Sequence, residues 1–85
     1  MSKRAIKTAE KNADLHGYLC GLASYEYNVI NVERHEDALY ANIRALELLE
    51  ILDWDSAHEL LSPIFDKAKQ QAYSERQVLE ELKAK

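Results

Sequence analysis

Turn-forming residues and cysteine are scarce in this 85-residue chain. It has two glycines, one proline and one cysteine, whereas average usage would give about six glycines and about four prolines. A single cysteine excludes an intrachain disulfide framework and favours a reducing compartment. β-branched residues are also few, and the helix formers Ala, Leu, Glu, Lys and Gln dominate instead. We therefore expect an all-α fold, in a single helical domain over residues 1–85.

Long apolar runs are absent as well. The longest uncharged stretch, residues 15–25, is too short to span a bilayer. The basic residues near the N-terminus are not followed by the apolar segment of a signal peptide. With 47% hydrophobic and 31% charged residues, the composition is that of a globular protein. We expect a cytoplasmic protein that contacts no membrane.

The net charge of −4 is unevenly distributed along the chain. Residues 1–25 hold four basic and two acidic groups, residues 60–85 hold five basic and four acidic groups, and residues 26–59 hold nine acidic groups against two basic ones. We call residues 26–59 the acidic belt. A belt of this kind repels nucleic acid and attracts basic partners.

Every fourth residue in the first part of the chain is small. The row consists of Ala5, Ala9, Ala13, Gly17 and Gly21, and it ends at Tyr25. Residues four apart share one face of an α-helix, so a second helix can approach this row more closely than usual. We expect helix packing above all at Ala9, Ala13, Gly17 and Gly21, and the expected counterpart is a second small patch, Ala38, Ala41 and Ala45.

Capping residues divide the chain into helices. The first helix is expected over residues 2–27, and the second over residues 32–52 with acidic residues near its first turn, where the helix dipole favours them. In the connection between them, Asn28 suits a C-cap and Asn31 an N-cap. Because short connections between long helices imply antiparallel neighbours, we expect an antiparallel bundle.

The region after the second helix allows two interpretations. Ser56 followed by Glu59 is a capping box, so a helix opens there. Pro63 then either bends that helix, or residues 56–61 form one short turn and Ser62 caps a new helix with Pro63 at its first position. We favour the second interpretation. The prediction is therefore a bundle of three long helices with at most one short additional helix.

Two segments carry more apolar surface than a small chain can cover. Residues 15–23 are apolar on almost every side of the first helix, and residues 46–52 form a second apolar run. A helix that is apolar all round is normally covered all round. Since 85 residues offer little covering surface, we expect a homodimer or a stable partner.

No residues with catalytic or metal-binding spacing stand out. His16, His35 and His58 lack the further inward-facing ligands that a metal site in a bundle needs, so we expect no metal and no cofactor. Cys20 lies one turn after His16, but its apolar surroundings favour an inert thiol. We therefore expect no catalytic activity of the chain itself.

Tyrosine and tryptophan complete the predicted binding surface. They suit interfaces because they combine a large area with a polar group, although the wet edge of a small core explains them equally well. With the carboxylates of the acidic belt, the surface comprises Tyr25, Tyr27, Glu33, Glu36, Asp37, Glu47, Glu50, Asp53, Trp54 and Asp55. We expect an adaptor, inhibitor or regulator that docks on a protein with a basic surface, including an inhibitor of a nucleic-acid-binding enzyme.

The basic N-terminal residues leave an alternative function open. Arg4, Lys7 and Lys11 share one helical face, and Lys3 lies beside them. A homodimeric regulator would present this face to nucleic acid. The acidic total charge makes nucleic acid the less expected partner, and a solvated helix face explains the same residues without any partner.

One short segment resembles a known family. Residues 14–22, Asp-Leu-His-Gly-Tyr-Leu-Cys-Gly-Leu, are similar to the Leu-His-Gly-x-Leu-x-Gly segment of the YgfB/YecA-like family of small helical bacterial proteins. The resemblance covers nine residues. We interpret it as convergence on tight helix packing and transfer no function from it.

Overall fold

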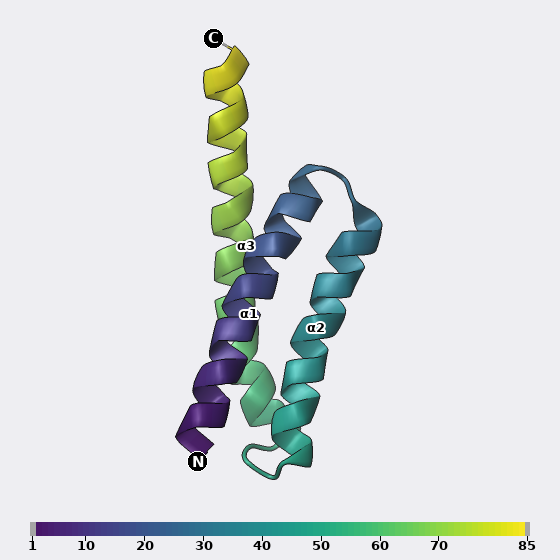
Figure 1. Cartoon of the computed structure of the whole chain (residues 1–85), viewed down its shortest axis with the longest axis vertical. Helices are drawn as coiled ribbons and strands as arrows, with labels where there is room; N and C mark the ends of the chain where they lie inside the picture. Colours follow the sequence, from purple (N-terminus) through teal and green to yellow (C-terminus); the bar gives the residue numbers. More distant parts are fainter. Residues whose placement is uncertain (1, 85) are drawn as a thin grey trace.

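The computed structural model describes residues 2–84 and consists of three α-helices joined by two short connections (Figure 1). These are α1 (Ser2–Tyr25), α2 (Val29–Leu48) and α3 (Trp54–Ala84). The described part of the chain contains no strand, so the expected all-α class is confirmed. Successive helices run in opposite directions, and α1 and α3 are therefore parallel (Figure 1).

The small residues of α1 pack against α3. A Cβ added at Gly17 would come within 2.9 Å of the Phe65 Cα, and one added at Gly21 within 2.8 Å of the Ala72 Cβ. Such separations are shorter than van der Waals contact between carbon atoms. Ala9 and Ala13, which precede the two glycines in the same row, are buried too. At Gly17 and Gly21, no side chain is tolerated because the α3 backbone lies directly against α1.

The prediction that Ala38, Ala41 and Ala45 of α2 form the counterpart of this row is wrong. Ala41 and Ala45 are exposed on α2, and Ala38 is only half-buried. The contact surface is provided instead by α3, which carries its own buried small residues at Ala68 and Ala72. Both helices thus contribute small side chains, which is what a close approach of two backbones requires.

The core lies where the three helices meet. Its largest fully buried side chains are Cys20 from α1, Ile43 from α2 and Leu61 from α3. Phe65 adds the one aromatic ring among the buried residues that the structure describes. Each helix therefore contributes at least one fully buried side chain to a common apolar interior.

The connection between α1 and α2 differs from the prediction. α1 ends at Tyr25, and Tyr27 adopts a left-handed backbone conformation with φ of 57°, as residues just beyond a helix end often do. Asn28 is the N-cap of α2, because its side-chain oxygen accepts a hydrogen bond from the Asn31 backbone N–H at 3.2 Å. Asn28 thus begins a helix instead of ending one, and α2 starts three residues earlier than expected, without an acidic residue in its first turn.

A carboxylate caps the N-terminus of α3. α2 ends at Leu48, Glu50 adopts φ of 58°, and Asp53 Oδ1 accepts a hydrogen bond from the Ser56 N–H at 2.7 Å. Asp53 is therefore the capping residue. The expected capping box, with Ser56 as its first member, is wrong because Ser56 lies within the first turn of the helix.

α3 continues through Pro63 without interruption. The favoured interpretation, a break at residues 61–63, is therefore wrong, and the structure shows no additional short helix in residues 2–84. Leu61 and Phe65, on either side of the proline, are buried, whereas the proline ring is exposed. We attribute the continuity to these two core contacts, which hold both flanking turns in place despite the missing N–H.

The C-terminal part of α3 extends beyond the connection between α1 and α2 (Figure 1). This makes the molecule elongated, with extents of 52 × 23 × 17 Å. Leu79 and Leu82 are exposed there, although they continue the spacing of the buried Ala68 and Ala72. Within residues 2–84, no helix has the length and apolarity needed to cross a membrane.

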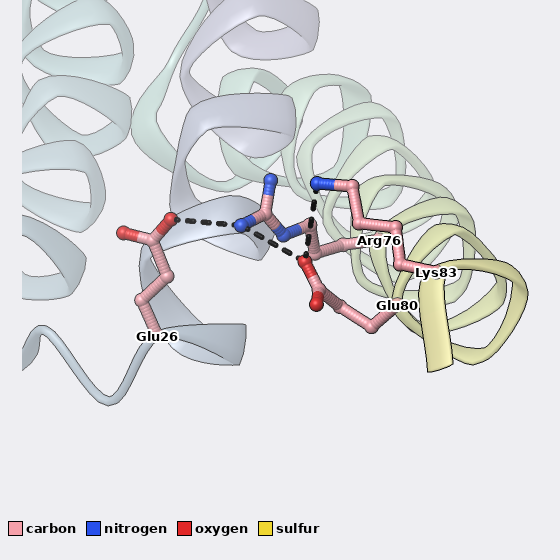
Figure 2. Close-up of polar contacts among 4 residues, drawn as sticks. All are labelled: Glu26, Arg76, Glu80 and Lys83. Carbon is pink, nitrogen blue, oxygen red and sulfur yellow. Dashed lines mark ion pairs between the residues drawn. The ribbon is translucent and has the colours of Figure 1, made fainter. Parts of the chain in front are cut away.

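A chain of ion pairs joins the end of α1 to this extension (Figure 2). The Arg76 guanidinium lies 3.8 Å from Glu26 and 3.2 Å from Glu80, and Lys83 lies 3.9 Å from the same Glu80 oxygen. The Arg76 guanidinium also lies 6.0 Å from the centre of the Tyr25 ring. Arg76 thus links the last turn of α1 to the extension of α3.

Candidate functional site

The first group of predicted acidic residues lies on one side of α2. Glu33 and Asp37 are exposed and Glu36 is half-buried. Their spacings of three and four residues place them on one stripe of the helix. Glu36 borders the buried side of α2, because the buried Ile43 follows it by seven residues, or about two turns, whereas Glu33 and Asp37 lie farther round toward solvent. The stripe is therefore available to a partner along the first half of α2.

A second acidic group surrounds the connection between α2 and α3. Glu50, Asp53 and Asp55 are exposed, and Glu47 is half-buried at the end of α2. The hydrogen bond from the Ser56 N–H to Asp53 lowers the pKa of that carboxyl. Asp53 therefore remains ionised at neutral pH and fixes the direction in which α3 leaves the connection.

Two aromatic rings lie between the acidic groups. Tyr40 on α2 and Trp54 at the start of α3 are parallel within 4°, with ring centres 6.3 Å apart. Tyr40 is 47% exposed and Trp54 is half-buried. The predicted surface did not include Tyr40, although it follows Glu36 by four residues and Asp37 by three, a spacing that placed it on the acidic stripe. The aromatic pair gives the acidic surface an apolar, flat centre.

Most of these carboxylates have no basic partner in the described part of the chain. Among residues 2–84, Glu47 contacts Arg44 at 3.6 Å, and the other six predicted acidic site residues take part in no ion pair. Unpaired carboxylates produce a continuous negative potential over the surface they share. The surface is therefore electrostatically suited to a cation or to a basic protein surface.

Two predicted site residues lie apart from this surface. Tyr25 packs edge-on against Tyr73 of α3, with ring centres 5.4 Å apart, and Tyr27 is 89% exposed at the opposite end of α2 from Trp54. A helix of 20 residues is about 30 Å long. Eight of the ten predicted residues thus lie along α2 and its C-terminal connection, whereas Tyr25 and Tyr27 lie near the N-terminal end of α2.

The basic residues of α1 form a separate exposed face. Lys3, Arg4, Lys7 and Lys11 line a shallow hollow of about 560 Å³ together with Thr8. None of the four basic side chains takes part in an ion pair within residues 2–84. This face is accessible to an anion, and its residues belong to a helix other than the one that carries the acidic stripe.

Sequence reasoning missed a pair of histidines between α1 and α2. His16 Nδ1 lies 2.9 Å from His35 Nδ1, and the rings are tilted by 39° with centres 5.2 Å apart. Burial, and then the charge of His16, lower the pKa of His35. No spacing signal reveals such a pair, because residues 19 positions apart meet only through the register of the helix hairpin.

The single thiol is buried beside this pair. Cys20 is fully buried, and its Sγ lies 3.8 Å from the Val32 carbonyl oxygen on α2. Burial raises the pKa of the thiol, with the charge of Lys69 acting in the opposite direction and those of Glu36 and Asp66 in the same direction. His16, which the sequence places one turn away, contacts His35 instead. The thiol is therefore protonated and shielded.

The remaining histidine lies near a hydroxyl. The Ser62 Oγ is 3.4 Å from both ring nitrogens of His58, which is long for a hydrogen bond that involves a hydroxyl. The His58 ring also faces Tyr40, with centres 6.3 Å apart. Within residues 2–84, no three His, Cys, Asp or Glu side chains come together as a metal site requires.

Comparison with known proteins gives no relative of this chain: no family model matches, and no curated protein or solved structure is significantly similar. The resemblance of residues 14–22 to a family segment is therefore limited to these nine residues. Functional arguments rest on the residues described above.

Proposed function

We propose that this chain is a small protein-binding protein without catalytic activity of its own, which works in the cytoplasm as an adaptor, inhibitor or regulator. It docks through the acidic surface of α2 and the connection to α3 on a partner with a basic surface. The observation that supports this proposal is the set of carboxylates without basic partners around the half-exposed rings of Tyr40 and Trp54.

The chemistry of this surface fits a partner rich in arginine. A guanidinium stacks favourably on the face of a tyrosine or tryptophan, and flanking carboxylates accept its hydrogen bonds. Charge complementarity of this kind mainly increases the association rate and the specificity of a complex. An inhibitor that occupies the basic groove of a nucleic-acid-binding enzyme would use the same complementarity.

Affinity capture with matched charge variants tests the proposal. The tagged full-length protein is used as bait in lysate of the native source, beside a variant with Glu33→Gln, Asp37→Asn and Asp55→Asn. The control variant, Glu10→Gln, Asp14→Asn and Glu81→Gln, changes the net charge equally outside the proposed surface.

We expect the wild-type and control baits to retain the same basic protein, identified by mass spectrometry. The surface variant should retain it at least about tenfold less, because three lost ion pairs of about 0.5 kcal/mol each sum to about 1.5 kcal/mol, and about 1.4 kcal/mol corresponds to a tenfold change in affinity. Equal retention by all three baits, or no retained protein, would contradict the proposal.

We further propose that the protein forms a homodimer. Leu15, Leu48 and Leu49 are exposed, with 52%, 69% and 64% of their surface accessible. Burial of such side chains between two copies would remove their apolar surface from water. Native mass spectrometry should show two subunits, and Leu48→Gln with Leu49→Gln should shift the protein to one. A wild-type monomer would contradict the dimer and leave the docking proposal intact.

A second candidate function is nucleic-acid binding by the basic face of α1. The exposed, unpaired side chains of Lys3, Arg4, Lys7 and Lys11 favour it. A mobility shift that weakens with salt and is abolished by Lys7→Glu with Lys11→Glu would support this function, since phosphate contacts release counterions. The absence of any shift at low salt would exclude it.

A further inference from the structure

The surface between α1 and α2 contains three successive polar contacts. Asn12 Nδ2 donates a hydrogen bond to Asn42 Oδ1 at 3.2 Å, His16 contacts His35 at 2.9 Å, and Cys20 contacts the Val32 carbonyl at 3.8 Å. The three α1 residues are four positions apart and lie one above another on the helix face toward α2. The histidine pair is the central contact.

The geometry of the histidine pair restricts how many protons it can hold. A neutral imidazole carries one N–H and one acceptor nitrogen, so the two facing Nδ1 atoms form a hydrogen bond when one hydrogen lies between them, which holds for the neutral pair and for the pair with one added proton. When both rings are protonated, both Nδ1 atoms carry a hydrogen. Two donors then face each other, and two positive charges lie on rings whose centres are 5.2 Å apart.

No carboxylate offsets this second charge within the described chain. Neither histidine forms an ion pair in residues 2–84, and the charge that acts on the pKa of His35 is that of His16. The charged groups that act on the neighbouring Cys20 thiol are Glu36 on α2 and Asp66 and Lys69 on α3, and none of the three is among the charges that act on the pKa of His35. Asn12 and Asn42, whose contact lies one helical turn from the histidine pair, do not titrate.

The three helices are not equally bound to one another. α1 lies directly against the α3 backbone at Gly17 and Gly21, and the contact between α2 and α3 is the smallest of the three. Loss of the histidine contact therefore affects the attachment of α2. Because the Val32 carbonyl of α2 lies beside the buried Cys20, movement of α2 exposes the thiol.

We propose that His16 and His35 form a pH-sensitive contact. It holds α2 against α1 while one hydrogen lies between the two Nδ1 atoms, and it releases α2 when both rings are protonated. This device does not depend on the acidic surface or on any partner. Mild acidity would thereby change the conformation of the helix that carries the proposed docking surface.

The direction of the pH effect follows from linkage. The folded state disfavours protonation of both rings at the same time, whereas both histidines in the unfolded chain accept a proton at their ordinary pKa of about 6.5. The folded state then binds fewer protons than the unfolded state, so stability falls as pH decreases below about 6.5 and stops falling below the pKa of the folded pair.

Labelling of Cys20 with 4,4′-dithiodipyridine measures the opening directly in the full-length protein. The labelling rate at each pH is divided by the rate for the unfolded chain at the same pH, which removes the intrinsic pH dependence of the thiol. We expect this ratio to rise at least about tenfold between about pH 7.5 and about pH 5, since one pKa unit corresponds to a tenfold change in equilibrium. Far-UV circular dichroism should show that the helices persist.

Three variants provide the comparison. His16→Gln and His35→Gln keep a polar side chain but remove the second charge, so the ratio should change less than about twofold over the same range. His58→Gln removes the histidine outside the pair and should keep the wild-type increase. An unchanged wild-type ratio, or an increase that persists in His16→Gln and His35→Gln, would contradict the proposal.

A second measurement does not depend on the stability of the variants. The imidazole signals of His16 and His35 are followed by NMR in the wild-type protein during titration to about pH 4.5. We expect the two rings of the wild-type pair to titrate together in two coupled steps, with one step displaced to lower pH. Independent single-step titration of His16 and His35 in the wild type would overturn the proposal.

Discussion

Gly17 on α1 lies against the backbone of Phe65 on α3, so closely that a methyl group at position 17 would come within 2.9 Å of the Phe65 Cα. Gly21 repeats this arrangement one turn later, beside Ala72. These two contacts set the distance between α1 and α3. α2 completes the core from the other side and carries the acidic stripe on its exposed surface.

Replacing Pro63 with alanine should stabilise the protein. In the interior of a helix a proline removes one backbone hydrogen bond and costs about 3 kcal/mol, and α3 is helical on both sides of Pro63. Part of this gain is lost because the unfolded chain becomes more flexible. We expect the free energy of unfolding in urea to rise by about 1–2 kcal/mol. A loss of stability would mean that a helix begins at the proline.

The charge of Asp53 should stabilise the start of α3 in a pH-dependent way. The hydrogen bond from the Ser56 N–H lowers the pKa of the folded carboxyl, so its contribution is present above the unfolded value of about 3.9 and is lost as pH falls through the lower folded value. Asp53→Ala should therefore reduce the melting temperature at neutral pH, and the difference from wild type should shrink below about pH 3.

Asp53→Asn provides the matched control, because it keeps an oxygen that can accept the same hydrogen bond. Its melting temperature at neutral pH should lie between those of wild type and Asp53→Ala. A difference between wild type and Asp53→Ala that is independent of pH would show that the Asp53 charge contributes nothing.

Arg76 should order the extension of α3 with little effect on overall stability. Its ion pairs with Glu26 and Glu80 are partly exposed, and pairs of this kind contribute about 0–1 kcal/mol each. Arg76→Met keeps part of the apolar contact with Tyr25 but removes the charge. Hydrogen exchange should become faster in residues 77–84 while residues 57–72 change little.

Arg34→Met is the control for this measurement, because Arg34 is exposed on α2 and takes part in no ion pair within residues 2–84. It should leave exchange in the extension unchanged. Equal exchange in wild type and Arg76→Met would show that the ion pairs are not what orders this segment.

The sequence predicted the row of small residues on α1 but not its partner. Two other segments offer small residues at helical spacing, Ala38 to Ala45 on α2 and Ala68 to Ala72 on α3. Helical periodicity identifies a face, whereas the choice between two faces depends on how all three helices pack. The structure places the two glycines of the row against α3.

The capping residues were misjudged for a related reason. Asn28, Asn31, Asp53 and Ser56 all have side chains suited to caps, and the residue that serves is decided by where the preceding helix ends. Left-handed conformations at Tyr27 and Glu50 mark those ends. Neither is a glycine, so no local pattern of residues indicates these positions.

The candidate site was only partly accessible to sequence reasoning. The carboxylates could be listed from composition and spacing, but the position of Tyr40 beside Trp54 depends on where α3 starts. The His16–His35 contact depends on the register between α1 and α2. Both relationships connect different helices, and a single sequence contains no periodic signal for either.

The account depends most on the close approach of α1 and α3, which the free energies of unfolding of Gly17→Ala and Gly21→Ala test directly. In an exposed helix, glycine to alanine stabilises by about 1 kcal/mol, and Ala45→Gly on the exposed side of α2 calibrates this effect in the same protein. Here the added methyl group meets the α3 backbone, so we expect each glycine variant to lose about 2 kcal/mol or more. A gain of about 1 kcal/mol in either variant would show that the two helices do not lie in contact there.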